Sequence, residues 1–359
     1  MRVRFAPSRA DPTSTGRPFA PSNATDREQR MIARNLIRAA VALGSILAAS
    51  AALAAPIKIG TVVWVGYGPF YVADALGMFK KAGLDVRIKM FADPVEIPPA
   101  IAGGSLQGGM VTYNQVFGPL EKGQVQKVVL PIDYSYGADA VVAATSVRSI
   151  AELKGRKIGL VQLSPSDLLL AYALSKHGIP ESEVNAINMA PDAVVPAMIS
   201  GQLVSGVTWE PMLSQLLAAG DGKKFHVIFS SKEVPGLIAD VLVFDDRFIK
   251  ANGPAIQKLV KVYLEALAFI NAKPDEAAKI IAKVMSISPK EVKEQMPLVH
   301  NFQPAEILKA FERSSEPLSF YGSGPIVRDL LKARGEIKTS PPIEATLEPS
   351  YAQAALGKK

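Results

Sequence analysis

Short apolar runs alternate with longer stretches of helical periodicity between residues 57 and 250. The clearest strand pattern is at 86–90, where Val86, Ile88 and Met90 alternate with charged residues. The other predicted strands are 57–64, 127–130, 140–144, 157–161, 206–209, 226–229 and 241–244. Helices are predicted at 69–82, 95–102, 167–177, 193–200 and 212–219. This alternation predicts α/β units with largely parallel sheets.

After about residue 250 the pattern becomes helical. Apolar residues recur at helical spacing from Ile256 to Leu267, which predicts an amphipathic helix. Further helices are predicted at about 276–285, 289–296, 304–314 and 325–334. Residues 336–359 are rich in proline at their start, and we predict a loose C-terminal tail there.

The first 54 residues differ from the rest of the chain. Residues 1–30 are rich in Pro, Ser, Thr and Arg, which predicts a disordered extension or a misassigned start ahead of Met31. Two arginines, an uncharged run of 17 residues and the small residues around Ala54 follow. This order is typical of a secretory signal peptide, and the run is at the short limit for a membrane anchor. We therefore predict a signal peptide at 31–54 and a periplasmic mature protein.

Composition excludes several classes of protein. The apolar fraction of 48% is enough for a core, and the absence of Cys excludes disulfides, thiolate metal sites and a lipid-modified Cys anchor. The net charge of +7 suggests nucleic-acid binding, but residues 1–54 carry eight Arg against three acids. The remaining 305 residues have 32 bases and 30 acids, a net charge of only +2. We therefore expect no nucleic-acid partner.

Four motifs then occur in order. The first is TVVWVGYGPFYVA at 61–73, followed by GMF at 77–79; the others are AGGSLQGG at 102–109, DYSYGAD at 133–139 and TWEP at 208–211. Together they resemble the substrate-binding proteins of ABC importers for nitrate, sulfonates, taurine and the thiamine pyrimidine precursor. The resemblance covers roughly residues 57–250. Gln107 stands where the family usually has an acid, which removes one charge near the second motif.

The resemblance implies a two-lobe α/β fold, the type II periplasmic-binding-protein fold, with the ligand between lobes joined by two crossings. Lobe 1 would hold residues 55–139 and 241–335, and lobe 2 residues 140–240. It also implies a monomeric binding protein that is not an enzyme, needs no cofactor or metal, and delivers its ligand to ABC permease and ATPase subunits. Such a protein would contact the membrane only through the permease.

The first motif places candidate ligand-binding residues at a strand end. Trp64 ends the first predicted strand, and Gly66 and Tyr67 precede a helix. Glycine lets a ligand approach the backbone, and a helix N-terminus offers free N–H groups to an anion. Trp64 and Tyr67 would form walls around an organic ligand; alternatively, Trp64 belongs to the core and Tyr67 packs on the turn.

The remaining candidates lie in later motifs and are also open to structural explanations. Gly104 and Ser105 form either an oxyanion site or a plain turn, and Tyr113 begins the next helix. Ser135 and Asp139 lie beside the first crossing. Ser166 either caps a helix or meets a ligand at that helix N-terminus. Trp209 and Glu210 follow a strand, at the usual rim of an α/β ligand crevice.

The charges of these candidates rank the ligands. Asp139 and Glu210 are acids, and the motifs contain no Lys or Arg, so bare nitrate or sulfate would have only dipoles to bind. We predict a small organic ligand, with an aliphatic sulfonate or taurine first and a pyrimidine-type or aromatic carboxylate ligand as the alternative. A ligand-sensing partner protein and a periplasmic enzyme on the same fold are further alternatives. The three His have no metal spacing, and no G-x-S-x-G motif occurs.

Overall fold

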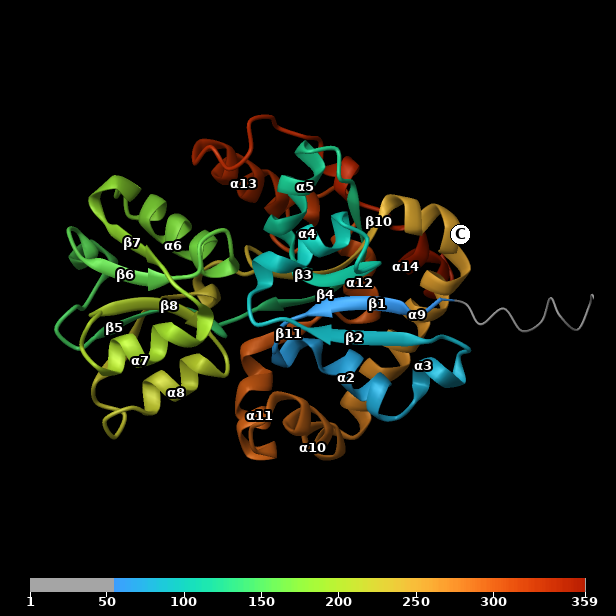
Figure 1. The fold of residues 1–359 in the computed structure, drawn as a ribbon, viewed down its shortest axis with the longest axis horizontal. Coiled ribbons are helices and arrows are strands. Elements are labelled where there is room, and N and C mark those ends of the chain that lie inside the picture. The colour runs from blue at the N-terminus through green and yellow to red at the C-terminus, as the bar shows by residue number, and fades with distance from the viewer. Residues whose placement is uncertain (1–54, 359) are drawn as a thin grey trace, which may run out of the picture. The chain divides into compact units, whose positions relative to one another are not determined.

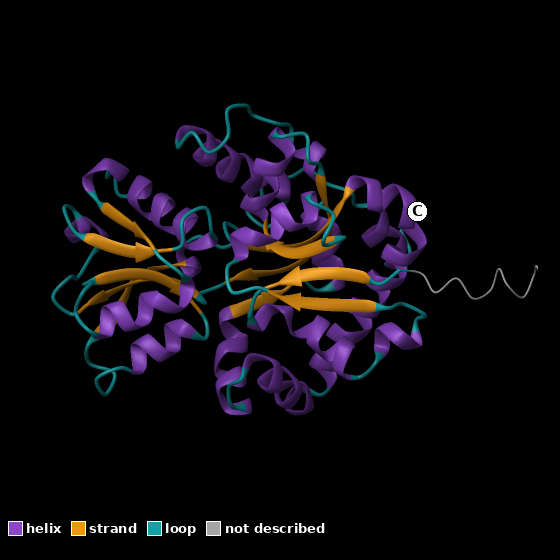
Figure 2. Ribbon diagram, in the orientation of Figure 1, coloured by secondary structure: helices purple, strands orange, loops and turns teal. Residues whose placement is uncertain are grey.

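The computed structural model describes residues 55–358. The predicted extension 1–30 and signal peptide 31–54 lie outside the described residues. The described chain folds around two separate β-sheets, each with helices on its faces (Figures 1 and 2). We call the parts built around them the first and the second lobe. This arrangement confirms the predicted two-lobe α/β fold.

The first sheet has the strand order β11-β4-β10-β3-β1-β2. Its strands are β1 (Ile57–Thr61), β2 (Val86–Met90), β3 (Gly108–Thr112), β4 (Gln126–Ser135), β10 (Ala239–Asp245) and β11 (Val299–Asn301). The α-helices outside the second sheet's segment are α2 (Gly68–Ala75), α3 (Met78–Lys81), α4 (Ile97–Ala102), α5 (Phe117–Glu121), α9 (Asp246–Ala272), α10 (Pro274–Met285), α11 (Pro289–Gln295), α12 (Pro304–Ala310), α13 (Phe320–Ala333) and α14 (Ser350–Ala355). The predicted helix at 69–82 is divided at Gly77, which adopts the left-handed conformation.

The second sheet has the order β7-β6-β8-β5-β9. Its strands are β5 (Asp139–Ala144), β6 (Lys157–Leu160), β7 (Asn185–Asn188), β8 (Ser205–Trp209) and β9 (Phe225–Ser230). The α-helices of this segment are α6 (Pro165–Lys176), α7 (Val194–Ile199) and α8 (Met212–Ala218). The chain passes from the first sheet to the second between β4 and β5, and returns between β9 and β10.

The prediction of largely parallel sheets is wrong. In the first sheet β10 runs antiparallel to both β3 and β4, and in the second β5 runs antiparallel to both β8 and β9. The reason lies in the crossings. A strand that arrives from the other lobe enters its sheet from the side where the carboxyl ends of the parallel strands lie. It must therefore run antiparallel to them. Alternation of strands and helices along the chain does not show this reversal.

The segment after Glu336, predicted to be a loose tail, packs against the first lobe. Ile343, Leu347 and Ala352 are buried, and Leu347 bridges to Val128 in β4. The Tyr351 hydroxyl donates to the carbonyl of Ile249 in α9 at 3.3 Å. Widely spaced apolar residues therefore anchor a segment whose composition suggested a free end. Within residues 55–358, no helix is both long enough and apolar enough to cross a membrane.

Candidate functional site

Strand ends from both sheets meet at one place. Thr112 ends β3 and is paired with Asp240 at the start of β10, while Trp209 ends β8 and is paired with Asp139 at the start of β5. The carboxyl ends of parallel strands are where α/β proteins bind ligands. Here the antiparallel crossing strands add their amino-terminal ends to the same place.

A cavity lies at this junction and is lined from both lobes. Its lining residues are Val62, Trp64, Tyr67, Pro94, Met110, Val111, Thr112, Gln115, Asp139, Pro165, Trp209, Ile238 and Asp240. The free volume is about 30 Å³, which is room for about two water molecules. An organic solute therefore enters only if the lobes part or these side chains shift.

Aromatic side chains form two walls of the cavity. Trp64 and Trp209, one from each lobe, are 4% and 6% exposed. The indole N–H of Trp64 donates to Asp133 Oδ1 at 3.0 Å, and the Tyr67 hydroxyl donates to Asp240 Oδ1 at 2.6 Å. These bonds orient the rings of Trp64 and Tyr67, so carboxylates hold the aromatic wall of the first lobe.

Asp133 and Asp240 form a buried carboxyl pair. They are direct partners on the antiparallel strands β4 and β10, and they are 0% and 2% exposed. Burial raises the pKa of both, and the charge of Asp133 adds to the rise at Asp240. Two like charges opposite each other on neighbouring strands are destabilising. The raised pKa values therefore favour a shared proton over two charges in the pair.

Gly66 makes room for this pair. A Cβ at this position would lie 2.4 Å from the carboxyl carbon of Asp133 and 2.5 Å from Nε1 of Trp64. No real side chain fits at those distances. Gly66 thus acts by letting Asp133 and Trp64 approach the backbone, and it is not among the residues that line the cavity.

Asp139 supplies a third buried carboxyl. It is 2% exposed, its backbone N–H donates to Ser135 Oγ at 3.1 Å, and its Oδ2 has no hydrogen-bond partner. Burial raises the pKa of Asp139 to about 7, and the nearby charge of Glu210 contributes to the rise. A buried carboxylate oxygen without a donor is costly, so this atom is suited to receive an N–H group from a ligand.

The lining of the cavity contains acids but no base. Among the residues that the structure places around it, Asp139 and Asp240 are ionisable acids, and Lys, Arg and His are absent. A sulfonate or nitrate would have no cationic partner here. A ligand with an ammonium group or several N–H donors would satisfy the carboxyls.

Three of the predicted site residues lie close to the cavity without lining it. The Glu210 carboxylate accepts from the Ser214 hydroxyl at 2.8 Å and from the Ser214 backbone N–H at 3.2 Å, so it is bound to the first turn of α8. Ser135 shares a 2.7 Å hydrogen bond with Ser231, which links the two crossings. Ser166 does not cap α6, because Ser164 is the N-cap and accepts the Ser166 backbone N–H at 3.1 Å. Ser166 is fully buried beside the lining residue Pro165, and its Oγ has no partner.

The structure does not bring the other three predicted residues to the cavity. Gly104, at φ +77°, and Ser105 form an exposed turn before β3, and the Ser105 hydroxyl donates to the carbonyl of Ala100 at 2.9 Å. Tyr113 is buried in the first lobe, where its hydroxyl bonds Thr346 at 2.7 Å and its ring packs on Phe320. Their roles in this structure are a turn and core packing.

Several lining or supporting residues were absent from the sequence-based candidates. Thr112, Gln115 and Asp240 line the cavity, and Asp133 supports it through its bond to Trp64. The two aspartates carried a usable signal, because each interrupts an apolar strand: Asp133 follows Val128–Ile132 and Asp240 precedes Val241–Phe244. A charged residue inside a buried strand is rarely there without a partner.

Comparison with known proteins identifies the family. Residues 64–277 match the family described as NMT1/THI5 like, and the chain belongs to that family. The match starts at Trp64 and includes every predicted site residue. It confirms the resemblance drawn from the four motifs.

Individual relatives are distant. The chain is 26% identical over 234 residues to a Brucella abortus protein named only as a binding protein, covering 65% of this chain and 72% of that one. It is 26% identical over 217 residues to the taurine-binding periplasmic protein of Escherichia coli (58% and 64%). It is 24% identical over 224 residues to a 4-amino-5-hydroxymethyl-2-methylpyrimidine phosphate synthase of Saccharomyces cerevisiae (59% and 65%).

The fold also matches solved structures. The alkanesulfonate-binding protein SsuA from Xanthomonas axonopodis pv. citri superposes with a TM-score of 0.68 at 18% identity, over 82% of this chain and 98% of that one. At this identity the likeness establishes a shared fold.

Proposed function

We propose that this protein is the solute-binding component of an ABC importer, and that its cavity at the junction of the two lobes is the solute site. The proposal is supported by the family, by the fold shared with periplasmic binding proteins, and by the convergence of strand ends from both lobes on one cavity. The lobes, 55–139 with 241–335 and 140–240, would rotate about the two crossings and close over the solute.

The ligand we propose is a small organic solute with an ammonium group or several N–H donors. The observation that carries this choice is the pair of acids, Asp139 and Asp240, in a cavity whose described lining has no base. A taurine-like aminosulfonate or an aminopyrimidine fits better than a simple alkanesulfonate, because each can donate to the carboxyls. Trp64, Tyr67 and Trp209 would pack against the organic part.

The partners and the location follow from this role. The 31–54 segment would export the chain to the periplasm, where the closed form would dock on a permease that works with an ATPase. The protein would act as a monomer without a cofactor. It would bind its solute without converting it.

A thermal-shift panel tests the ligand class. The mature chain, from Ala55, would be melted with taurine, ethanesulfonate, nitrate, benzoate and 4-amino-5-hydroxymethyl-2-methylpyrimidine. A ligand at 100 times its Kd adds about 2.7 kcal/mol to the free energy of unfolding, a shift of roughly 5–10 °C for a domain of this size. We expect taurine or the aminopyrimidine to give that shift, and ethanesulfonate and nitrate to give none.

The matched control is Asp139→Asn, which removes the acid and keeps its size. The shift should shrink in this variant by most of its value. A shift with ethanesulfonate that Asp139→Asn leaves intact would contradict the proposed ligand class. A shift with none of the five solutes would contradict it as well.

A second function is favoured by the yeast synthase among the relatives. If the chain were such an enzyme, an incubation with a candidate solute would produce a new compound detectable by mass spectrometry. We expect the solute to be recovered unchanged after denaturation of the protein. Recovery of a modified pyrimidine in amounts equal to or above the protein would overturn the binding role.

A further inference from the structure

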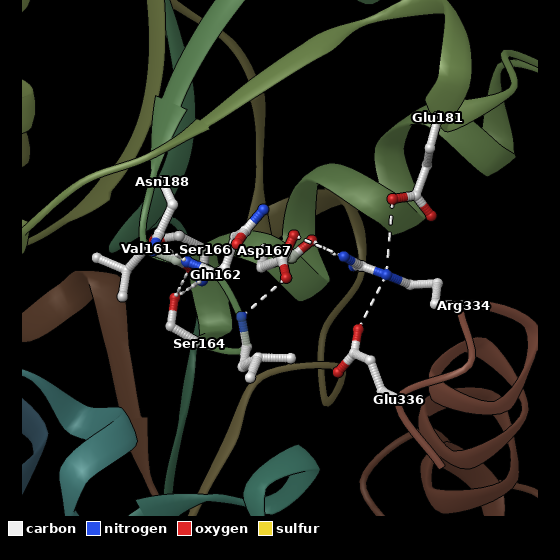
Figure 3. Close-up of polar contacts among 10 residues, drawn as sticks. Val161, Gln162, Ser164, Ser166, Asp167, Glu181, Asn188, Arg334 and Glu336 are labelled. Atoms are coloured by element: carbon white, nitrogen blue, oxygen red, sulfur yellow. Dashed lines mark hydrogen bonds and ion pairs between the residues drawn. The ribbon is translucent and has the colours of Figure 1, made fainter. Parts of the chain in front are cut away.

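One arginine joins the two lobes at a distance from the solute cavity. Arg334 follows α13, a helix of the first lobe whose Phe320 packs on Tyr113 at a ring distance of 4.6 Å. Its guanidinium reaches α6 of the second lobe, where Nη2 bonds Asp167 Oδ1 at 2.8 Å and Nη1 donates to the Asp167 carbonyl at 3.3 Å. Figure 3 shows the side chain lying between groups from the two lobes.

Two more carboxylates surround the same guanidinium. Nε lies 3.6 Å from Glu181 of the second lobe and 2.9 Å from Glu336 of the first (Figure 3). The side chains of Arg334 and Asp167 are only 17% and 6% exposed. This partial burial makes the ion pairs less subject to screening than surface pairs. The cluster therefore contributes to how firmly the lobes hold together.

The balance of charge makes the cluster depend on Arg334. Three carboxylates, from Asp167, Glu181 and Glu336, face one cation. Without the arginine, Asp167 and Glu181 of the second lobe would face Glu336 of the first with nothing between them. The contact would then change from attractive to repulsive, and the lobes would be pushed apart.

The same segment of the second lobe reaches both the cluster and the cavity. Asp167 uses its other oxygen, Oδ2, to accept the N–H of Leu163 at 2.8 Å, and Leu163 has a positive φ of 62°. Pro165, between these two residues, lines the solute cavity. A contact at Asp167 therefore helps to position the N-terminus of α6, whose first residue lines the cavity.

We propose that Arg334 is a latch: its ion pairs with Asp167 and Glu181 stabilise the closed arrangement of the lobes and position the 163–167 segment, which contains the first turn of α6, beside the cavity. The latch acts on closure itself, with or without a solute. Its effect on solute retention rests on the proposed function, because only a protein that binds a solute between its lobes would gain affinity from it.

Distance measurement between spin labels tests the latch without a ligand. The chain has no native Cys, so Lys223→Cys after α8 and Lys290→Cys in α11 give two specific labelling sites on exposed positions of the two lobes. In the doubly labelled protein, closed lobes give a short distance between the labels and open lobes a long one. Arg334→Gln should lower the ratio of the short-distance to the long-distance population roughly 5- to 10-fold at low salt. Rising salt should weaken the short-distance population of the parent protein.

The control is Arg328→Gln, which removes a cation from α13, the helix that precedes Arg334. Arg328 pairs with the neighbouring Asp329 at 2.8 Å, within the first lobe. The distribution of label distances in Arg328→Gln should match that of the parent. Arg334→Lys should give an intermediate distribution, because an ammonium keeps the charge and loses the two-pronged contact with Asp167.

A rescue variant separates repulsion from misfolding. Arg334→Gln with Glu336→Gln removes the carboxylate that faces Asp167 and Glu181, and should restore much of the short-distance population. If Arg334→Gln and Arg328→Gln give the same distribution at every salt concentration, the latch is wrong. If Arg334→Gln differs and the double variant shows no recovery, the repulsion that we infer is also wrong. None of these outcomes depends on the thermal-shift panel.

Discussion

Asp139 is the residue whose environment has the most direct consequence. Its carboxyl is buried with one oxygen unpartnered, and the charged groups around it are the acids Glu210, Asp133 and Asp240. The folded-state pKa of about 7 lies above the ordinary value of 3.8, so the folded chain binds this proton more tightly than the unfolded chain. The stability that this proton provides is complete below about pH 4, and it is lost as the pH rises to about 7.

Asp139→Asn keeps the neutral state at every pH. We expect the variant to nearly match the parent in stability at pH 4 and to exceed it at pH 8, by up to about 4 kcal/mol for a shift of about three pKa units. Thermal melts at the two pH values measure this. Asp192→Asn, at an exposed position, is the control and should leave the pH profile unchanged. A stability difference that is equal at pH 4 and pH 8 would mean that folding does not raise the pKa of Asp139.

At this scale the sequence predicts some contacts and misses others. Trp64, Tyr67, Asp139 and Trp209 stand in motifs at strand ends, and the structure brings all four to one cavity. Asp133 and Asp240 are far apart in the chain, and their pairing depends on the register of β4 against β10. That register follows from the return crossing, which no local pattern of residues shows.

The C-terminal segment adds buried apolar contacts to the first lobe. Composition suggested a free tail, yet the buried residues Ile343, Leu347 and Ala352 attach it to β4 and α9. Ending the chain after Lys338 would expose the surface that these side chains cover. We expect the free energy of unfolding to fall by at least about 3 kcal/mol, the cost of losing one or more large buried side chains.

Chemical denaturation of the shortened chain measures this loss. The control ends the chain after Leu356, which removes only the last residues Gly357–Lys359. That control should unfold at the parent's denaturant concentration. Equal stability of both shortened chains would show that the segment packs without contributing to the stability of the fold.

Most other elements agree with the sequence-based prediction. Strands of 4–8 residues and helices of 10–20 residues differ in the period at which apolar residues recur. The long helix α9 includes the predicted 256–267 pattern, whose residues Leu259, Val260 and Tyr263 are buried. The strand β3 was missed because Gly108 and Gly109 interrupt its apolar run. Both glycines meet large side chains, Phe244 and Ile97, where any Cβ would clash.

At the scale of the whole molecule, the two Trp residues report on closure. Trp64 and Trp209 are the only two in the chain, and the structure places one in each lobe with both facing the same cavity. A solute bound between them should change the fluorescence of both. We expect Trp209→Phe to reduce both the fluorescence change and the affinity for the solute that raises the melting temperature.

Trp64→Phe is the companion variant, since it leaves Trp209 as the single reporter. It should keep a fluorescence response, with affinity lowered by the loss of the bond to Asp133. If Trp209→Phe binds and responds like the parent, Trp209 does not contact the solute, and the second lobe closes by another surface.

Solute binding at the buried acids would also exchange protons with the solvent. A ligand ammonium that pairs with Asp139 favours its ionised form, so the proton held there near neutral pH leaves to the surroundings as the solute enters. Below about pH 7, apparent affinity would then fall by up to about tenfold for each pH unit, and buffer-dependent binding heats would count the protons released. Handing the solute to a permease would reverse the exchange, because the emptied carboxyl takes a proton back. Each delivery cycle would thus be sensitive to the acidity of the medium in which the protein works.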